Sequence, residues 1–473
     1  GPVKYLSFTS DFFDVEINGN YHFQNIWNAF QKSMNRYIPA INYEKMAGAL
    51  ENKFGYQLDV KNLDELTSVF APGLKIETPF LLYGRLDSEQ SVFELKGSIP
   101  GFSTDNMAVR NIFIGNNPQE KVYASKFRFG EIMLKNGMNL SNVTVSSKIS
   151  DNTIDNLIEW GNPEEMQYSG RIKTRSVFSD IAGSNFPHVE TEGFPTHIYI
   201  SDSLWQISAF TATIDSTLIT INDFNFFNEN QLIAIEGIIS EDETGELTAS
   251  FGNIDLANFS NYLNRELPFR GMLNGMASIR DFYGQRLLFS NLSVDDFYFK
   301  DQKIGNVKLA NNWDILTSVL NSNITITNSG RESLNASGYY NPKTNEMLYD
   351  VTADNLSLVI LETIIRKTFS NIHGDASGKI KIHGSPQNIL LTGAMEGNNA
   401  GLTIDFTQVS YVFTDTVYFR GDTIHFDQIT VRDISGNHGT FDGTIVHTNF
   451  KNMLYDLTVN TPKILDLDIW KAK

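Results

Sequence analysis

Three side chains in one short stretch belong to the types that bind metal ions: His188, Glu190 and His197. Imidazole nitrogens and carboxylate oxygens are the usual zinc ligands where cysteine is absent. Zinc sites combine such residues at characteristic spacings, and this set matches none of them. We therefore expect no metal centre here.

Two groups of acidic residues could hold a proton or a calcium ion. Asp295 and Asp296 form a carboxylate pair, but neighbouring residues of a strand point to opposite faces and cannot share a proton. The segment from Asp433 to His438 lacks the alternating acidic residues and the closing glutamate of a calcium loop, so we expect a polar turn. His425 and His447 fall on the polar side of predicted strands, and this position predicts imidazoles in contact with solvent.

The sequence contains no motif for nucleophilic or phosphate chemistry. It has no G-x-S-x-G turn, no phosphate-binding glycine loop and no dinucleotide fingerprint. None of its 473 residues is cysteine, which excludes disulfides, thiolate nucleophiles and cysteine-bound metals. We therefore expect a protein that is not an enzyme and carries no cofactor.

Composition limits the possible partners. The 55 acidic and 37 basic residues give a net charge of −18, which argues against nucleic acid or an anionic membrane surface as a partner held by charge. Hydrophobic residues make up 41% of the chain, including 34 phenylalanines, and charged residues only 19%. A chain this apolar can present apolar surface to something other than itself. No apolar run is long enough to span a membrane, and Gly1-Pro2 resembles a protease-cleavage scar, so we expect any anchor to lie outside this fragment.

A repeat with a period near one hundred residues runs through the second half of the chain. Gly271 and Gly374 are 103 residues apart, and so are Gly275 and Gly378. Just upstream, the segment N-I-D-L matches N-L-S-L at a separation of 102. Such a period indicates stacked copies of one supersecondary unit, each of which buries its apolar face against its neighbours.

Apolar and polar residues alternate along most of the chain, and turn signals such as Asn341-Pro342 separate the alternating runs. This pattern predicts an all-β fold: an elongated, repetitive antiparallel sheet with one apolar and one wet face. If no second sheet covers the apolar face, the sheet curls into a U-shaped trough with an apolar interior. The residues expected to line that trough and contact lipid are Phe93, Leu95, Ile219, Ile221, Ile233, Ile235, Ile380, Ile382, Leu402, Ile404, Phe406, Val417, Phe419, Ile424 and Phe426. For each of them, the alternative is an ordinary core residue that touches only protein.

We expect three segments and four short helices. The segments are an N-terminal β-rich part, a first repeat unit and a last repeat unit, at residues 1–200, 201–310 and 311–473. The helices are expected near 24–36 and 63–70 in the first segment, at 257–265 in the second and at 358–369 in the third. They can be core elements that plug the sheet, or they can gate an apolar groove.

The last third of the chain resembles a known family. The run G-D-A-S-G-K-I-K-I-H-G-S-P ends at Pro386, and Gly393 follows it. Further strands then lead to D-I-S-G-N-H-G-T-F-D-G, which ends at Gly443. This order is similar to the TamB (translocation and assembly module B) family of the AsmA-like group, in its Bacteroidota form. The resemblance is good from Gly338 to Leu467 and moderate from Ser201 to Val307.

The resemblance implies a location and a role. Such proteins are anchored in the inner membrane and cross the periplasm, and their sheet is curled into a trough with an apolar interior. The family is implicated in moving phospholipid to the outer membrane, alongside an Omp85-type barrel. The resemblance therefore implies a periplasm-spanning bridge that conducts phospholipid between the two membranes. We expect the family's membrane anchor and its final segment to lie outside this chain, so anchoring and barrel docking are not assigned to its residues.

Two other functions remain open. The first is an assembly scaffold whose open sheet edges receive strands of outer-membrane barrel proteins by β-augmentation. The second is a β-helix enzyme acting on polysaccharide. That fold has shorter coils and needs clustered carboxylates, which this sequence lacks. Charge placed at Ile404 or Phe419 separates conduit from scaffold, because only the conduit depends on the apolar interior.

Overall fold

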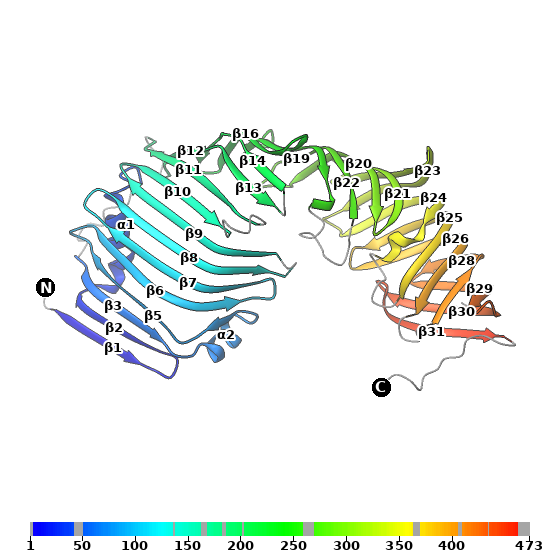
Figure 1. The fold of residues 1–473 in the computed structure, drawn as a ribbon, viewed down its shortest axis with the longest axis horizontal. Coiled ribbons are helices and arrows are strands. Elements are labelled where there is room, and N and C mark those ends of the chain that lie inside the picture. The colour runs from blue at the N-terminus through cyan, green and yellow to red at the C-terminus, as the bar shows by residue number, and fades with distance from the viewer. Residues whose placement is uncertain are drawn as a thin grey trace. The chain divides into compact units, whose positions relative to one another are not determined.

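Alternating apolar and polar residues form strands along almost the whole chain (Figure 1). The computed structural model describes residues 3–41, 51–135, 138–161, 168–181, 186–200, 203–258, 269–362, 369–404, 409–433 and 435–461. In these residues, 31 strands form one antiparallel sheet. The predicted all-β fold, an elongated antiparallel sheet with a few short helices, is confirmed.

The chain divides into two units, which are described separately here. Unit 1 contains the described residues up to Ala249 together with Arg280–Gln285, and unit 2 contains the other described residues from Ser250 onward. The three segments expected at 1–200, 201–310 and 311–473 follow the sequence repeat rather than these units, and that division stays a prediction.

Unit 1 consists of antiparallel strands, most of which are joined by short turns. Its strands are β1 (Lys4–Thr9), β2 (Phe13–Asn20), β3 (Lys53–Val60), β4 (Lys75–Glu77), β5 (Phe80–Asp87), β6 (Val92–Ser103), β7 (Met107–Pro118), β8 (Tyr123–Leu134), β9 (Asn139–Ser150), β10 (Thr153–Trp160), β11 (Gly170–Ser179), β12 (His188–Gly193), β13 (Thr196–Ile200), β14 (Ser203–Ile207), β15 (Phe210–Asp215), β16 (Leu218–Asn228), β17 (Gln231–Ile239) and β18 (Glu246–Asp255), which crosses the unit boundary. Both β12 and β13 pair with β11, because the chain breaks its strand at Phe194 and Pro195.

Unit 2 continues the same pattern with longer strands. Its strands are β19 (Phe269–Arg280), β20 (Leu287–Phe299), β21 (Gln302–Asp314), β22 (Val319–Asn328), β23 (Arg331–Asn341), β24 (Glu346–Ser357), β25 (Phe369–Ser385), β26 (Asn388–Ile404), β27 (Val409–Phe413), β28 (Thr416–Gly421), β29 (Thr423–Asp433), β30 (His438–Thr448) and β31 (Lys451–Asn460). From β20 to β26 each strand pairs with the next one along the chain. This local connectivity makes the sheet a sequence of hairpins.

Mid-strand bulges interrupt the alternation. Asp223, Asp296, Asn355 and Gln428 lie inside strands with φ between 48° and 59°, and the pairing register shifts at each of them. A bulge adds one residue to its strand, bends the strand and increases its twist. It also moves the next apolar residue three positions along instead of two, so the same face stays apolar on both sides of the bend.

Helices are short and few. Helix α1 (Ile26–Asn35), which follows the 3₁₀ turn η1 (Phe23–Asn25), and helix α2 (Asp64–Phe70) lie where helices were expected. The 3₁₀ turn η2 (Leu358–Leu361) occupies the start of the expected 358–369 helix, residues 363–368 lie outside the described residues, and Phe369 already begins a strand. The expected helix at 257–265 also falls almost entirely outside them.

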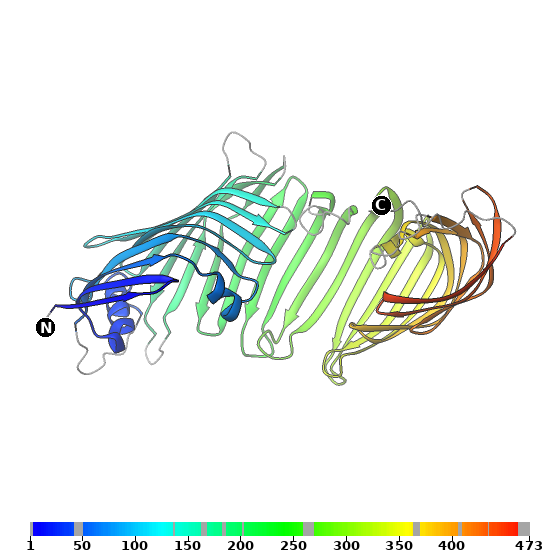
Figure 2. The same ribbon diagram turned by 90° about the horizontal axis from the view of Figure 1, so that it is seen from below.

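The buried clusters lie where these short elements meet the sheet. Ala29 of α1 is buried with Phe54 and Leu86 of unit 1, and Tyr37, just after α1, is buried with Tyr123. In unit 2, Val359 of η2 is buried in a third cluster with neighbouring strands. Figure 2 shows the strands of unit 1 bending around α1 and those of unit 2 bending around the yellow η2 turn. Among the described residues, none of the helices is both long and apolar enough to cross a membrane.

Candidate functional site

An apolar row crosses five neighbouring strands of unit 1. Each of its members lies directly opposite the next: Ile114 on β7, Phe127 on β8, Val145 on β9, Ile158 on β10 and Ile172 on β11. All five side chains are half-buried. The face that carries this row is called the apolar face of unit 1.

Five of the six predicted lipid-contacting residues of unit 1 are half-buried on this face. Leu95 on β6 is one of them, since Gly97 of the same strand is opposite Ile114. The other four are Ile219, Ile221, Ile233 and Ile235, which the register connects to the same face through β12 and β15. The bulge at Asp223 keeps the β16 side chains on both sides of it on this face. All five are half-buried.

Phe93, the sixth predicted residue of unit 1, also lies on the apolar face, but α1 covers it. Its ring meets that of Phe30 edge-on, with the ring centroids 4.9 Å apart. It also packs against the two buried clusters around α1 and Tyr37. Phe93 therefore has the contacts of a core residue, the alternative that the sequence left open.

The predicted residues of unit 2 gather on one face of its sheet. Ile380 is opposite Gly393, Gly393 is opposite Phe419, and Phe419 is opposite Ile424. The neighbouring positions bring Ile382, Val417 and Phe426 to the same face, and a shift at Asn399 returns Leu402 to it. All of these side chains are half-buried except Val417, which is 9% exposed. The side chain of Ile404 and the whole of Phe406 lie outside what the structure describes.

Sequence reasoning missed the strands β7 to β11, which hold the longest straight apolar row of unit 1. The signal was present as alternation, for example in K-F-R-F-G, which places Phe127 and Phe129 on one face with Lys126 and Arg128 on the other. It also missed the bulges, because an asparagine or aspartate within a strand pattern looks like a turn signal.

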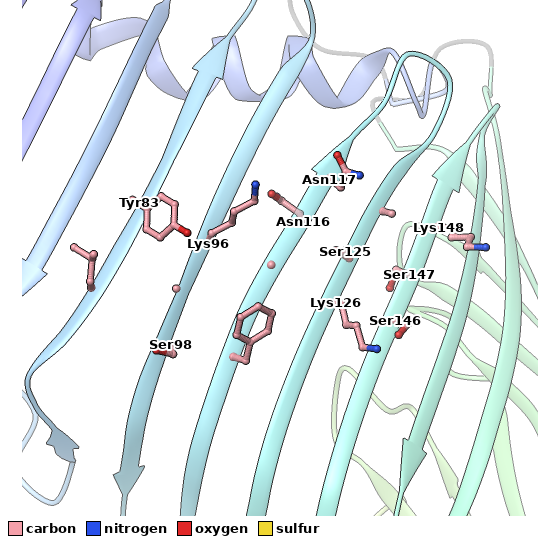
Figure 3. Close-up of a pocket in the computed structure, with 15 residues that line it drawn as sticks. Tyr83, Lys96, Ser98, Asn116, Asn117, Ser125, Lys126, Ser146, Ser147 and Lys148 are labelled. Atoms are coloured by element: carbon pink, nitrogen blue, oxygen red, sulfur yellow. The ribbon is translucent and has the colours of Figure 1, made fainter.

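The face opposite the apolar one is polar in unit 1. Lys126 is exposed there, and Arg128 lies over the ring of Phe113, with its guanidinium carbon 4.5 Å from the ring centroid. A shallow hollow of about 580 Å³ on this part of the sheet is lined by side chains that include Tyr83, Lys96, Lys126 and Lys148 (Figure 3). Leu81 and Phe113 also line this hollow, so its lining combines lysines with apolar side chains.

The histidine and carboxylate candidates form ion pairs and turns. His188 is within hydrogen-bonding distance of Asp215, on the neighbouring strand, and of Glu190, and together these carboxylates raise its pKa, with Asp215 as the larger cause. Asp433 accepts hydrogen bonds from the backbone N–H groups of Ser435 and Asn437, as a polar turn requires. Among the described residues, no three potential ligands are placed to hold a metal ion.

One histidine prediction is wrong. His447 was expected in solvent, but only 3% of it is exposed, and its ring stacks on Phe450 with the centroids 4.4 Å apart. Burial lowers the pKa of its imidazole below the ordinary value. Alternation predicted the wrong environment here because Phe450 and Asp422, whose carbonyl accepts the backbone N–H of His447, lie outside the strand that carries it.

In comparisons with known proteins, no family model, no curated protein and no solved structure matches the chain. The candidate site therefore rests on its own geometry, which is a half-exposed apolar face that passes from strand to strand within each unit.

Proposed function

We propose that this protein carries phospholipid along the apolar face of its sheet. The observation that carries the proposal is the half-exposure of apolar side chains in unbroken rows, from Ile114 to Ile172 in unit 1 and from Phe419 to Ile424 in unit 2. Large contiguous apolar surface on a protein is typical of a binding site for a partner or a lipid.

The energetic reason is the cost of hydrating acyl chains. Burial of each CH₂ group in an apolar environment is favourable by about 0.8 kcal/mol. Transfer of two acyl chains of about sixteen carbons into water therefore costs roughly 25 kcal/mol. A row of apolar side chains on neighbouring strands, about 4.8 Å apart, lets a chain pass from one contact to the next without that cost.

The resemblance of Gly338 to Leu467 to TamB proteins supports the same role and extends it. On the basis of that resemblance, the proposal includes a periplasmic location, an inner-membrane anchor outside this chain and an Omp85-type barrel as partner. In that setting the sheet is part of a bridge that conducts phospholipid between the inner and outer membranes. The location, the anchor and the barrel are parts of the proposal.

Native mass spectrometry of the purified protein tests this function. We expect mass additions equal to those of phospholipids, with bound lipid lost after extraction and regained from phospholipid vesicles. A protein that binds no lipid under either condition would contradict the conduit. The assembly scaffold depends on backbone edges, so it predicts binding of unfolded barrel strands with no need for lipid.

A further inference from the structure

A line of uncharged polar side chains runs along the apolar face of unit 1. Its members lie directly opposite one another on five neighbouring strands: Asn116 on β7, Ser125 on β8, Ser147 on β9, Asn156 on β10 and Thr174 on β11. We call this line the polar row. Each member is half-buried and lies two residues along its strand from a member of the apolar row, so it is on the same face. The polar row therefore runs parallel to the apolar row, about 7 Å away along the strands.

A shorter row of the same kind lies in unit 2. Ser290, Asn311 and Ser322 are opposite one another on β20, β21 and β22, two residues from Leu292 and its apolar neighbours. The Asn311 Nδ2 group donates to Ser290 Oγ at 2.8 Å. A line of polar side chains thus lies beside a line of apolar side chains in both units, which indicates that both units bind a ligand with the same two kinds of group.

The polar row of unit 1 offers hydrogen-bond donors without charge. Ser147 Oγ donates to Asn156 Oδ1 at 2.6 Å, which leaves the two N–H donors of the Asn156 amide directed elsewhere. Among the described residues, that amide nitrogen and the hydroxyls of Ser125 and Thr174 have no hydrogen-bond partner. A ligand that fits this site must combine neutral hydrogen-bond acceptors with a long apolar part.

An ester-linked lipid has this chemistry. Its two ester carbonyl oxygens are neutral acceptors, and each acyl chain begins at its carbonyl carbon. We propose that the polar row binds the ester carbonyls of diacyl lipids while their chains lie on the apolar row. This inference rests on the proposed lipid-carrying function and names the part of the lipid that the site recognises. A few placed polar groups in an otherwise apolar site fix orientation in the same way.

Paired lipids that differ only in the carbonyl test this inference. Diester and diether phosphatidylcholine with equal chain lengths compete for the purified protein, and native mass spectrometry measures the bound ratio. We expect wild type to favour the diester lipid by about fivefold, the order of magnitude for one hydrogen bond. The variant with Ser125, Ser147, Asn156 and Thr174 all changed to alanine removes these donors, so it should bind both lipids equally, with diester binding reduced to the level of the diether lipid.

Ser146→Ala is the matched control, because Ser146 is the neighbour of Ser147 on the opposite face, and it should keep the preference. Melting curves of all variants establish that each is folded. Equal binding of the two lipids by wild type would overturn the role of the polar row while leaving the lipid-carrying function standing. Failure to bind either lipid would overturn both. A preference that survives in the folded four-residue variant would show that groups outside the polar row recognise the ester, and it would overturn the inference.

Discussion

The backbone N–H of Asn253 donates to the side-chain Oδ1 of Asn274 at 2.7 Å, and Asn253 has a φ of 51°. One repeat later, the N–H of Asn355, with a φ of 49°, donates to Ser377 Oγ at 2.8 Å. The two copies of the sequence repeat therefore share a second feature besides their glycines. In each copy, the exposed backbone N–H of a bulge residue donates to a polar side chain from further along the chain. The same arrangement joins Asp296 to Asn306. These capped bulges mark where the strands bend.

Removal of a cap should loosen its bulge. The variant Asn274→Ala leaves the Asn253 N–H without its side-chain acceptor, and loss of one such hydrogen bond costs about 1 kcal/mol. We expect hydrogen exchange at the Asn253 amide to accelerate about fivefold to tenfold, and Ser377→Ala to do the same at Asn355. The control is Asn321→Ala, at an exposed position of β22, which should leave both amides unchanged. Unchanged exchange in the cap variants would show that the bulges hold without their caps.

Charge on the apolar face should abolish lipid binding, whereas charge on the other face should not. Phe419 is half-buried on the apolar face of unit 2, and its neighbour Tyr418 is 40% exposed on the opposite face. A carboxylate at position 419 loses favourable hydration when an acyl chain covers it, and nothing there compensates the charge. We expect Phe419→Asp to lose most of the phospholipid detected by mass spectrometry and Tyr418→Asp to keep it. Equal lipid content in the two folded variants would refute a lipid site on this face.

The buried His447 should make the protein less stable in mild acid. Burial lowers its pKa below the unfolded value of 6.5, so between 6.5 and the lowered pKa the unfolded chain binds a proton that the folded chain does not. Its contribution to stability is therefore present above 6.5 and is lost as the pH falls. We expect the melting temperature of wild type to drop more steeply than that of His447→Gln between about pH 7 and about pH 5.

The contribution of His188 to stability depends on pH in the opposite direction. Asp215 and Glu190 raise the pKa of His188, so its contribution is lost as the pH rises through the raised value. The variant Asp215→Asn removes the larger cause, so it separates this effect from that of His447. If the melting temperatures of wild type and His447→Gln fall equally as the pH decreases, the loss of stability in acid does not come from His447.

Glu362 should hold the η2 turn on the apolar face of unit 2. Its carboxylate forms an ion pair with Lys300 and accepts the backbone N–H of Ile372 at 3.1 Å, and its side chain is 8% exposed. Glu362→Ala leaves that buried N–H unpaired, which costs about 1–3 kcal/mol. Glu362→Gln keeps an acceptor oxygen and loses only the charge, so we expect a smaller effect. Faster proteolysis near η2 and stronger binding of an apolar dye should follow the order Ala, Gln, wild type.

Lipid content of the same two variants separates the two roles open to the short elements. A turn that only plugs the sheet predicts lower stability with unchanged lipid. A turn that gates the apolar face predicts more bound lipid in Glu362→Ala, because removal of η2 exposes Phe297 and Leu334.

Several features of the site were predictable because they are local. Alternation alone put Ile380 and Ile382 on one face and Lys379 and Lys381 on the other, since successive side chains of a strand point to opposite sides. The same rule failed at His447, because the contacts that bury its ring come from outside its own strand. It also failed to show that α1 covers Phe93, which lies more than sixty residues from Phe30 in the sequence.

The sequence by itself determined the strand-rich fold, the repeat and the apolar side of most strands, because backbone geometry and a two-residue period act over a few residues. Only the tertiary structure decided that Ser147 and Asn156 continue one line with Asn116 and Thr174. Strand register sets such lines, and each strand's position depends on hydrogen bonds to its neighbours and on bulges that shift it by one residue. A polar residue among apolar ones is unremarkable along a chain, and its alignment across five strands exists only in the folded sheet.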